Sequence, residues 1–183
     1  MYLKASKLKQ WLARSDCPPF LRECKVVFDK AFAKRESNDP PASSAFGPVP
    51  AGLENLVHGP SVALRARHVV EDIVYSRCST HVGNSLIMFY PQGDRSIPPS
   101  PGSIQEIVVY PNRDVVYIVK RQMPAGPELD DPFSEYPHFP AKLYHNLLSP
   151  ELEMVRPDWV LSHYAQWAVD VNNVVVLTLS HVR

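Results

Sequence analysis

The sequence is short of cysteine and glycine, and both shortages narrow the possible functions. Its three cysteines, Cys17, Cys24 and Cys78, are an odd number and include no CxxC pair. This argues against a disulfide framework and predicts a reducing, intracellular compartment. The seven glycines form no glycine-rich phosphate loop. No apolar run approaches the roughly 20 residues of a membrane span, so the sequence predicts no membrane segment.

Proline is abundant, and the charge is unevenly divided. Nineteen prolines among 183 residues are about twice the usual share, which excludes long uninterrupted helices over most of the chain. Residues 1–36 hold nine Lys or Arg and four Asp or Glu, whereas residues 37–183 hold ten and fifteen. A protein that coats nucleic acid would be basic throughout. Here only the first part has that character, and the two parts are expected to attract each other.

Residues 1–36 predict a helical hairpin. A short helix over residues 7–14 is followed by Pro18 and Pro19, which suit the first turn of a second helix. That second helix carries an apolar stripe at three- and four-residue spacing, formed by Phe20, Leu21, Cys24, Val27, Phe28, Ala31 and Phe32. Residues 37–61 hold five prolines and three glycines, a composition typical of a linker.

From residue 62 onward the pattern is that of short strands. Strands are expected over residues 69–79, 85–90, 104–110, 115–121 and 174–181. The alternation slips near Gln105 and Glu106, which predicts a β-bulge. Residues 111–114 are expected to form a turn and residues 123–151 a long loop, while residues 159–167 are ambiguous between a strand and a short helix.

Five or six short strands with irregular connections predict a small antiparallel β-barrel. The expected fold class is therefore α+β, with three parts along the chain. These are a helical leader (1–36), a proline-rich linker (37–61) and a small β-barrel domain (62–183).

Six segments carry a resemblance to a known family. They are Ser79–Leu86 (STHVGNSL), Gly102–Ile107 (GSIQEI), Asp131–Phe133 (DPF), Tyr136–Tyr144 (YPHFPAKLY), Trp159–Ala165 (WVLSHYA) and Leu8–Leu12 (LKQWL). The chain resembles the C-terminal region of CACTA-type (En/Spm-like) transposase proteins, in the copies found in mushroom-forming fungi. In that family the strand-transfer chemistry is attributed to a separate upstream domain.

The resemblance implies a transposon-derived chain without the catalytic domain, either a gene fragment or a stand-alone derivative. Such C-terminal regions are compared with small chromatin-associated barrels of the BAH or Tudor kind. The resemblance therefore also implies a BAH/Tudor-like barrel in a chromatin-associated, nuclear protein, by analogy of fold.

Acidic residues are the first candidates for catalysis. A transposase or nuclease site needs carboxylates that converge on two metal ions, and Asp130, Asp131 and Glu135 share one loop with His138. A solvated acidic loop accounts for this cluster better, because short runs of carboxylates are usually surface charge. A small metal-dependent nuclease or hydrolase that uses Asp130, Asp131 and His138 is the alternative function.

Zinc and nucleophile sites are also disfavoured. Cys78 and His81, taken with the cysteines of the leader, lack zinc-knuckle spacing, and Cys24 belongs to the apolar stripe. The local pairs Cys78 with His81 and Ser162 with His163 carry no recognisable nucleophile elbow, and adjacent side chains on a strand point to opposite faces. The sequence therefore predicts no catalytic residue, no metal and no cofactor.

Aromatic and basic side chains are the binding candidates. Barrels that read methylated lysine use an aromatic box. Six rings lie in or near predicted strand ends, Tyr90, Tyr117, Tyr136, Trp159, Tyr164 and Trp167. The binding candidates among them are Tyr90, Trp159, Tyr164 and Trp167. The alternative is that these rings fill the core. The basic side chains that could meet phosphates are Lys4, Lys7, Lys9, Arg14, Arg22 and Lys25. Alternatively, they form a solvated helix face or one that docks on the acidic barrel.

The sequence thus predicts a non-catalytic binding module whose partner is a chromatin protein, a basic peptide or DNA. A folded transposon remnant without a selected function is a further alternative.

Overall fold

The structure is a computed structural model that describes residues 46–126, 129, 131–136 and 138–179. The chain divides into two compact units, residues 1–43 and 44–183, and all of the described residues lie in the second. The predicted helical hairpin over residues 1–36 therefore lies outside the described residues.

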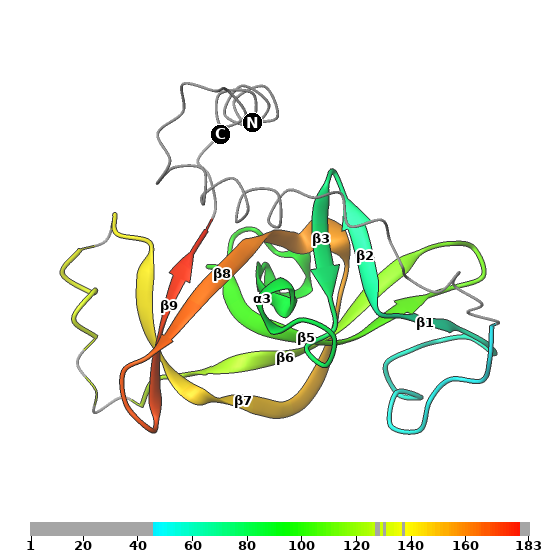
Figure 1. Cartoon of the computed structure of the whole chain (residues 1–183), viewed down its shortest axis with the longest axis horizontal. Helices are drawn as coiled ribbons and strands as arrows, with labels where there is room; N and C mark the ends of the chain where they lie inside the picture. Colours follow the sequence, from blue (N-terminus) through cyan, green and yellow to red (C-terminus); the bar gives the residue numbers. More distant parts are fainter. Residues whose placement is uncertain (1–45, 127–128, 130, 137, 180–183) are drawn as a thin grey trace, which may run out of the picture. The chain divides into compact units, whose positions relative to one another are not determined.

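Six antiparallel strands close into a barrel (Figure 1). They are β4 (Leu86–Phe89), β5 (Ser100–Val109), β6 (Val115–Pro124), β7 (Ala141–Val155), β8 (Val160–Ala168) and β9 (Asn173–Thr178). Their order is β5-β4-β8-β9-β7-β6, and β6 pairs with β5 to complete the ring. A further strand, β1 (Ala63–Arg65), pairs with the last residues of β5. Closure matters because it removes the open strand edges at which sheets aggregate.

Two long strands change partners along their length. The first five residues of β7 pair with β9, and its later residues pair with β6. In the same way β8 pairs first with β4 and then with β9. Register shifts in the β4–β8 and β6–β7 pairs mark irregularities, and such bulges bend a strand and increase its twist.

A separate hairpin stands beside the barrel. Strands β2 (Arg67–Val70) and β3 (Ile73–Ser76) form a two-stranded sheet in which Val70 lies opposite Ile73. The two turn residues, Glu71 and Asp72, both have left-handed backbone conformations, with φ of 47° and 66°. This is the geometry that a two-residue hairpin turn with the twist of its strands requires, although glycine and asparagine are its usual residues.

The helical elements are short. The helix α3 (Val82–Ser85) has four residues, and the His81 side chain caps it by accepting a hydrogen bond from the Asn84 N–H. Single 3₁₀ turns, η1 (Pro91–Gly93) and η2 (Pro157–Trp159), lie at the ends of β4 and β8. Among the described residues no helix has the length and apolar character needed to cross a membrane.

Three hydrophobic clusters hold the described unit together. The first joins the hairpin to the barrel, because it contains Tyr75 of β3 together with Ile104 of β5 and Tyr117 of β6. The second places Leu53 and Val57 against strands β5 and β6, so residues 46–62 pack on the sheet although their composition predicted a linker. The third lies between β4, β8 and β9.

The α+β class and the BAH/Tudor-like helical-leader architecture expected from the sequence are wrong. The described unit is mainly β, a closed six-stranded antiparallel barrel with no described helix of seven or more residues. The expectation rested on the periodicity of residues 1–36, which lie outside the described residues. The β-barrel itself is confirmed.

Several finer predictions for residues 62–183 are confirmed. The bulge near Gln105 is present as a register shift between Ile104 and Glu106 in the β5–β6 pair. The turn at residues 111–114 joins β5 to β6, and β9 pairs with β7 and β8 as the last strand. The ambiguous residues 159–167 form the end of a 3₁₀ turn followed by most of β8.

Two of the expected elements are wrong. Residues 69–79 are not one strand, since Glu71 and Asp72 turn the chain back and divide the segment between β2 and β3. Residues 123–151 are not one long loop, since β6 runs to Pro124 and β7 begins at Ala141. The strand β7 was missed because it carries Pro150 and because its change of partner interrupts a simple alternation.

Candidate functional site

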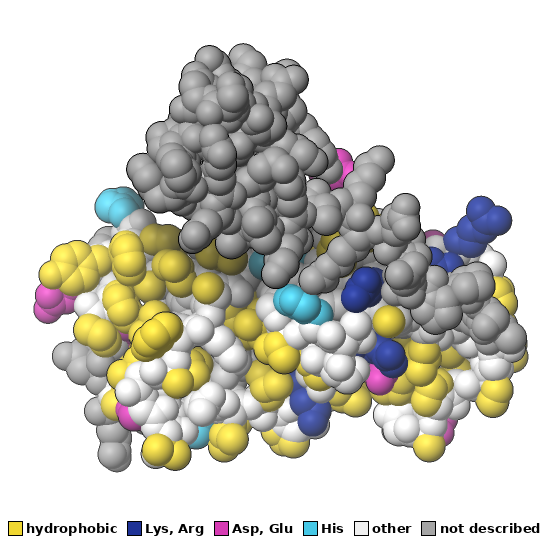
Figure 2. Space-filling view, in the orientation of Figure 1, with side chains coloured by type: hydrophobic (Ala, Val, Ile, Leu, Met, Phe, Trp, Pro, Cys, Tyr) yellow, Lys and Arg dark blue, Asp and Glu magenta, His cyan; other side chains and the backbone are white. Residues whose placement is uncertain are grey.

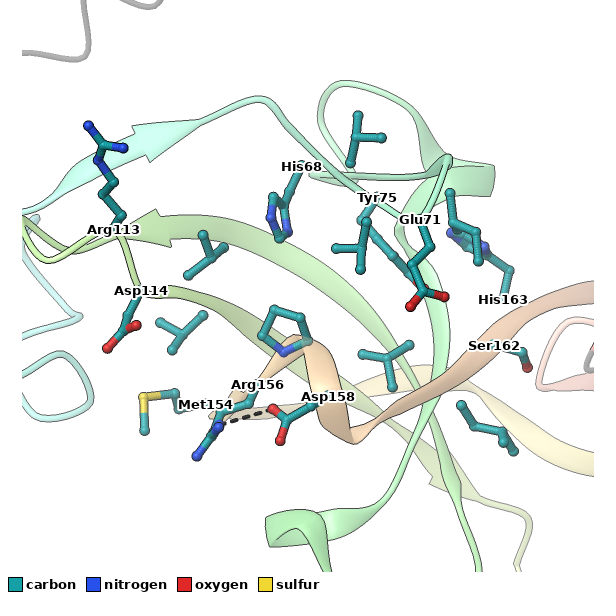
Figure 3. Close-up of a pocket in the computed structure, with 18 of the residues that line it drawn as sticks. His68, Glu71, Tyr75, Arg113, Asp114, Met154, Arg156, Asp158, Ser162 and His163 are labelled. Carbon is teal, nitrogen blue, oxygen red and sulfur yellow. Dashed lines mark hydrogen bonds and ion pairs between the residues drawn. The ribbon is translucent and has the colours of Figure 1, made fainter.

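A groove of about 1570 Å³ lies between the β2–β3 hairpin and the barrel (Figure 3). One wall is the hairpin, with Val69 and Ile73 among its lining residues. The other wall comes from η2 and β8, including Leu161, and from Leu179, which follows β9. The groove exists because the turn at Glu71 and Asp72 folds the hairpin back beside the barrel.

Three aromatic rings line the inner part of the groove, from His68, Tyr75 and His163, and a fourth, Tyr117, is fully buried beneath them. His163 of β8 stacks on Tyr75 of β3, with ring centroids 4.8 Å apart. Tyr75 in turn lies 5.5 Å from Tyr117 of β6, which meets His68 of β2 edge-on at 5.8 Å. A hydrogen bond of 2.8 Å joins the Tyr117 hydroxyl to His68 Nδ1. These contacts attach both strands of the hairpin to the barrel.

Burial sets the ionisation of these rings. It lowers the pKa of His68 and of His163, with the Arg65 charge adding to the effect on His68. Burial also raises the pKa of the Tyr117 hydroxyl. The inner part of the groove is therefore uncharged near neutral pH, with neutral imidazoles and phenols.

The groove is lined by charged side chains of both signs, Glu71, Asp114 and Asp158 with Arg113 and Arg156, and three of them have local partners. Arg156 Nε donates to Asp158 Oδ1 at 3.0 Å, and both side chains are well exposed. Asp114 accepts a hydrogen bond of 2.7 Å from the Asn112 amide. An exposed ion pair contributes little to stability, and these pairs leave the groove without a concentrated charge of one sign.

The groove offers no convergent catalytic set. Among the described residues no group of three His, Cys, Asp or Glu side chains could hold a metal ion. Ser162 Oγ is buried without a hydrogen-bond partner in the described part, and it does not bond its neighbour His163. His163 Nε2 instead donates to the Asn84 carbonyl oxygen at 3.3 Å. Cys78 donates to Gln105 Oε1 at 3.5 Å and so has a structural partner.

The four aromatic candidates do not come together as one box. Tyr90 and Trp159 are neighbours, joined by a hydrogen bond of 2.9 Å between the Tyr90 N–H and the Trp159 carbonyl. Each ring already has a cation of this chain over it, Arg95 on Tyr90 at 5.8 Å and Arg156 on Trp159 at 5.9 Å.

The other two candidates lie on opposite faces of β8. Tyr164 is buried in the cluster between β4, β8 and β9, whereas Trp167 is 77 % exposed. A buried phenol and an exposed indole on opposite sides of one strand cannot share a ligand.

The acidic alternative is only partly described. Asp130 lies outside the described residues. Asp131 uses its carboxylate to hold its own loop, since Oδ1 accepts from the Phe133 N–H at 3.0 Å and Oδ2 from the Leu143 N–H at 3.3 Å. His138 is exposed. The basic candidates Lys4, Lys7, Lys9, Arg14, Arg22 and Lys25 also lie outside the described residues.

Sequence reasoning missed the residues that form the groove. Tyr75 fell within the single strand expected over residues 69–79, His68 was not a candidate, and His163 was considered only with its neighbour Ser162. A paired reading of residues 67–76 as a hairpin places His68 opposite Tyr75. This pairing could have been predicted only from a hairpin turn at Glu71 and Asp72. The turn is hard to recognise in the sequence because it contains neither glycine nor asparagine.

Comparison with known proteins adds no relative. No protein-family profile, curated protein or solved structure matches the chain. Function is therefore argued from the groove and the exposed surfaces.

Proposed function

We propose that this chain is a non-catalytic binding module that holds an extended segment of a partner protein in the groove between the β2–β3 hairpin and the barrel. The observation that carries the proposal is the groove itself. Its volume of about 1570 Å³ exceeds the roughly 300–1,000 Å³ typical of small-molecule pockets. A polypeptide segment is a ligand of suitable size.

The chemistry of the lining supports an apolar segment. Val69, Ile73, Leu161 and Leu179 are exposed apolar side chains in the groove walls. Burying such side chains releases roughly 25 cal/mol per Å² of apolar surface removed from water. The lining charges are of both signs, three acidic against two basic side chains, and His68 is neutral. This gives little attraction for phosphate, so the lining favours protein over nucleic acid as the ligand of this groove.

The test is a peptide selection against the full chain. A displayed peptide library is selected on the wild type, and the recovered peptides are then measured against Val69→Arg and Leu161→Arg, one on each wall. Both side chains are exposed, so the substitutions leave the core intact. Ile97→Arg, at an exposed apolar position that does not line the groove, is the matched control.

We expect peptides that bind the wild type and the control alike and lose at least about tenfold in affinity, about 1.4 kcal/mol, on each groove variant. Peptides that bind all four proteins equally would contradict the proposal, as would a selection that yields no binder. Histone-tail peptides and duplex DNA belong in the same assay. They test the predictions, made from the resemblance, that the partner is a chromatin protein or DNA.

A further inference from the structure

The strands β7, β8 and β9 expose an apolar face that the groove does not use. The register places Trp167 of β8, Val175 of β9 and Leu143 of β7 in one row across the sheet. A second row contains Ala165, Leu177 and Ala141. Side chains of cross-strand neighbours point to the same side of a sheet. We call these six residues the apolar face.

The opposite side of the same strands is the buried one. Tyr164, Val174 and Val176 alternate with the residues of the apolar face, and each is only 2 % exposed. Trp167, in contrast, is 77 % exposed. Figure 2 shows hydrophobic side chains gathered over this end of the molecule. Within the described residues, the side that carries Trp167 is covered only in part. Leu143 is 8 % exposed, and Val175, Leu177 and Ala141 are half-buried. The exposed part of the apolar face is therefore centred on Ala165 and Trp167 of β8.

Exposed apolar residues continue beyond the two rows. Val169 and Val171 follow in the β8–β9 turn, 58 % and 87 % exposed. From these exposures the accessible apolar surface is on the order of 500 Å², which is within the range of the largest patch of a monomer. A stable interface buries about 800 Å² on each partner, including a polar rim.

We propose that the apolar face is a self-association surface, and that two copies of the chain pack face to face through it around a twofold axis. In a twofold interface the same patch meets itself, so any charge in it would face a like charge. The two rows contain no charged residue, so this face meets a second copy without like-charge repulsion.

The shape of the surface also fits a second copy. Sheets stack about 10 Å apart when both present apolar side chains over a broad area. This chain itself carries such a face, and its apolar area is close to the apolar share, a little over half, of the surface that a stable dimer buries on each partner. The proposal does not depend on what occupies the groove, because the six residues of the apolar face do not line it.

Sedimentation equilibrium of the full chain tests the proposal over about 1 to 200 µM, a range that detects micromolar dissociation constants. We expect a monomer–dimer equilibrium in the wild type. Trp167→Lys and Ala165→Arg should each raise the dissociation constant at least about tenfold, because each places like charges opposite each other across the twofold axis. Ile97→Lys, an exposed apolar position in another segment, should leave the dissociation constant unchanged.

Circular dichroism and melting of each variant check that the fold is intact, and two independent variants protect against the failure of one. A wild type that stays monomeric at about 200 µM would overturn the proposal. A dimer that both charged variants leave unchanged would overturn it too, since the contact would then lie elsewhere. Binding of a different protein to this face of a monomeric chain would have the same consequence.

Discussion

Replacing Tyr117 with Phe tests how the hairpin is attached to the barrel. Tyr117 is fully buried, and its hydroxyl makes a hydrogen bond of 2.8 Å with His68 Nδ1. The substitution removes one oxygen atom and leaves the ring in place between Tyr75 and His68. Any loss of stability therefore reports on the hydrogen bond and not on packing.

The expected loss follows from the burial of the two partners. A typical intramolecular hydrogen bond contributes about 0.5–1.5 kcal/mol, and leaving a buried partner unsatisfied costs about 1–3 kcal/mol. His68 is only half-buried, so water can satisfy part of the freed Nδ1. We expect Tyr117→Phe to lower the free energy of unfolding by about 1–1.5 kcal/mol, and the melting temperature by about 2–6 °C.

Urea unfolding at pH 7.5, followed by circular dichroism, measures this loss. Tyr110→Phe is the control, since the Tyr110 hydroxyl has no hydrogen bond in the described structure and its removal should change the stability by less than about 0.5 kcal/mol. A double-mutant cycle with His68→Ala should give a coupling of at least about 0.5 kcal/mol. A loss for Tyr117→Phe no larger than that of the control would refute this account of the hairpin attachment.

Three further predictions concern pH and backbone geometry. The half-buried imidazoles of His68 and His163 have pKa values below the ordinary 6.5. Below about pH 6.5 the unfolded state therefore binds more protons than the folded state. The free energy of unfolding should fall as the pH drops through this range. Urea titrations at pH 8 and pH 5.5 measure this, and His163→Phe should reduce the difference. Gly102→Ala should lower the free energy of unfolding by about 1–3 kcal/mol, because the new Cβ would lie 2.6 Å from a side-chain atom of β6. Gly126→Ala is the control and should leave the free energy of unfolding nearly unchanged, since Gly126 has open space around it. Equal effects of the two substitutions would contradict the close packing at Gly102. Asp72→Gly should raise the free energy of unfolding by up to about 1 kcal/mol, because glycine adopts the φ of 66° found at this position without strain. If the variant is less stable than the wild type, the Asp72 side chain itself stabilises the turn.

The barrel strands could be predicted where alternation and turn chemistry agreed. The slip of the pattern at Gln105 gave the bulge, because a bulge shifts every later side chain to the other face and leaves that mark in the sequence. Asn112 gave the β5–β6 turn, and its side chain does accept a hydrogen bond from the Asp114 N–H. These are local signals, and local sequence is sufficient to encode them.

The groove could not be predicted in the same way. It depends on a turn in which Glu71 and Asp72 both adopt left-handed conformations, and neither residue type signals that geometry. Its rings come from distant parts of the chain, His68 and Tyr75 from the hairpin and His163 from β8. Tyr117, which holds His68 from beneath, is 49 positions away from it. Residue types alone predicted an aromatic site, but they could not select which rings meet.

Strand β8 relates the two proposed surfaces to each other. Every second side chain of β8 points to the same side, which carries His163, Ala165 and Trp167. His163 stacks on Tyr75 in the groove, whereas Ala165 and Trp167 belong to the apolar face. If both proposals hold, a dimer presents two grooves, and a partner with two copies of the bound segment gains affinity through the higher effective concentration of the second segment. Trp167→Lys should then weaken binding of a tandem peptide while leaving binding of a single peptide unchanged. Equal weakening of both would show instead that Trp167 acts on the groove directly, through the strand that the two surfaces share.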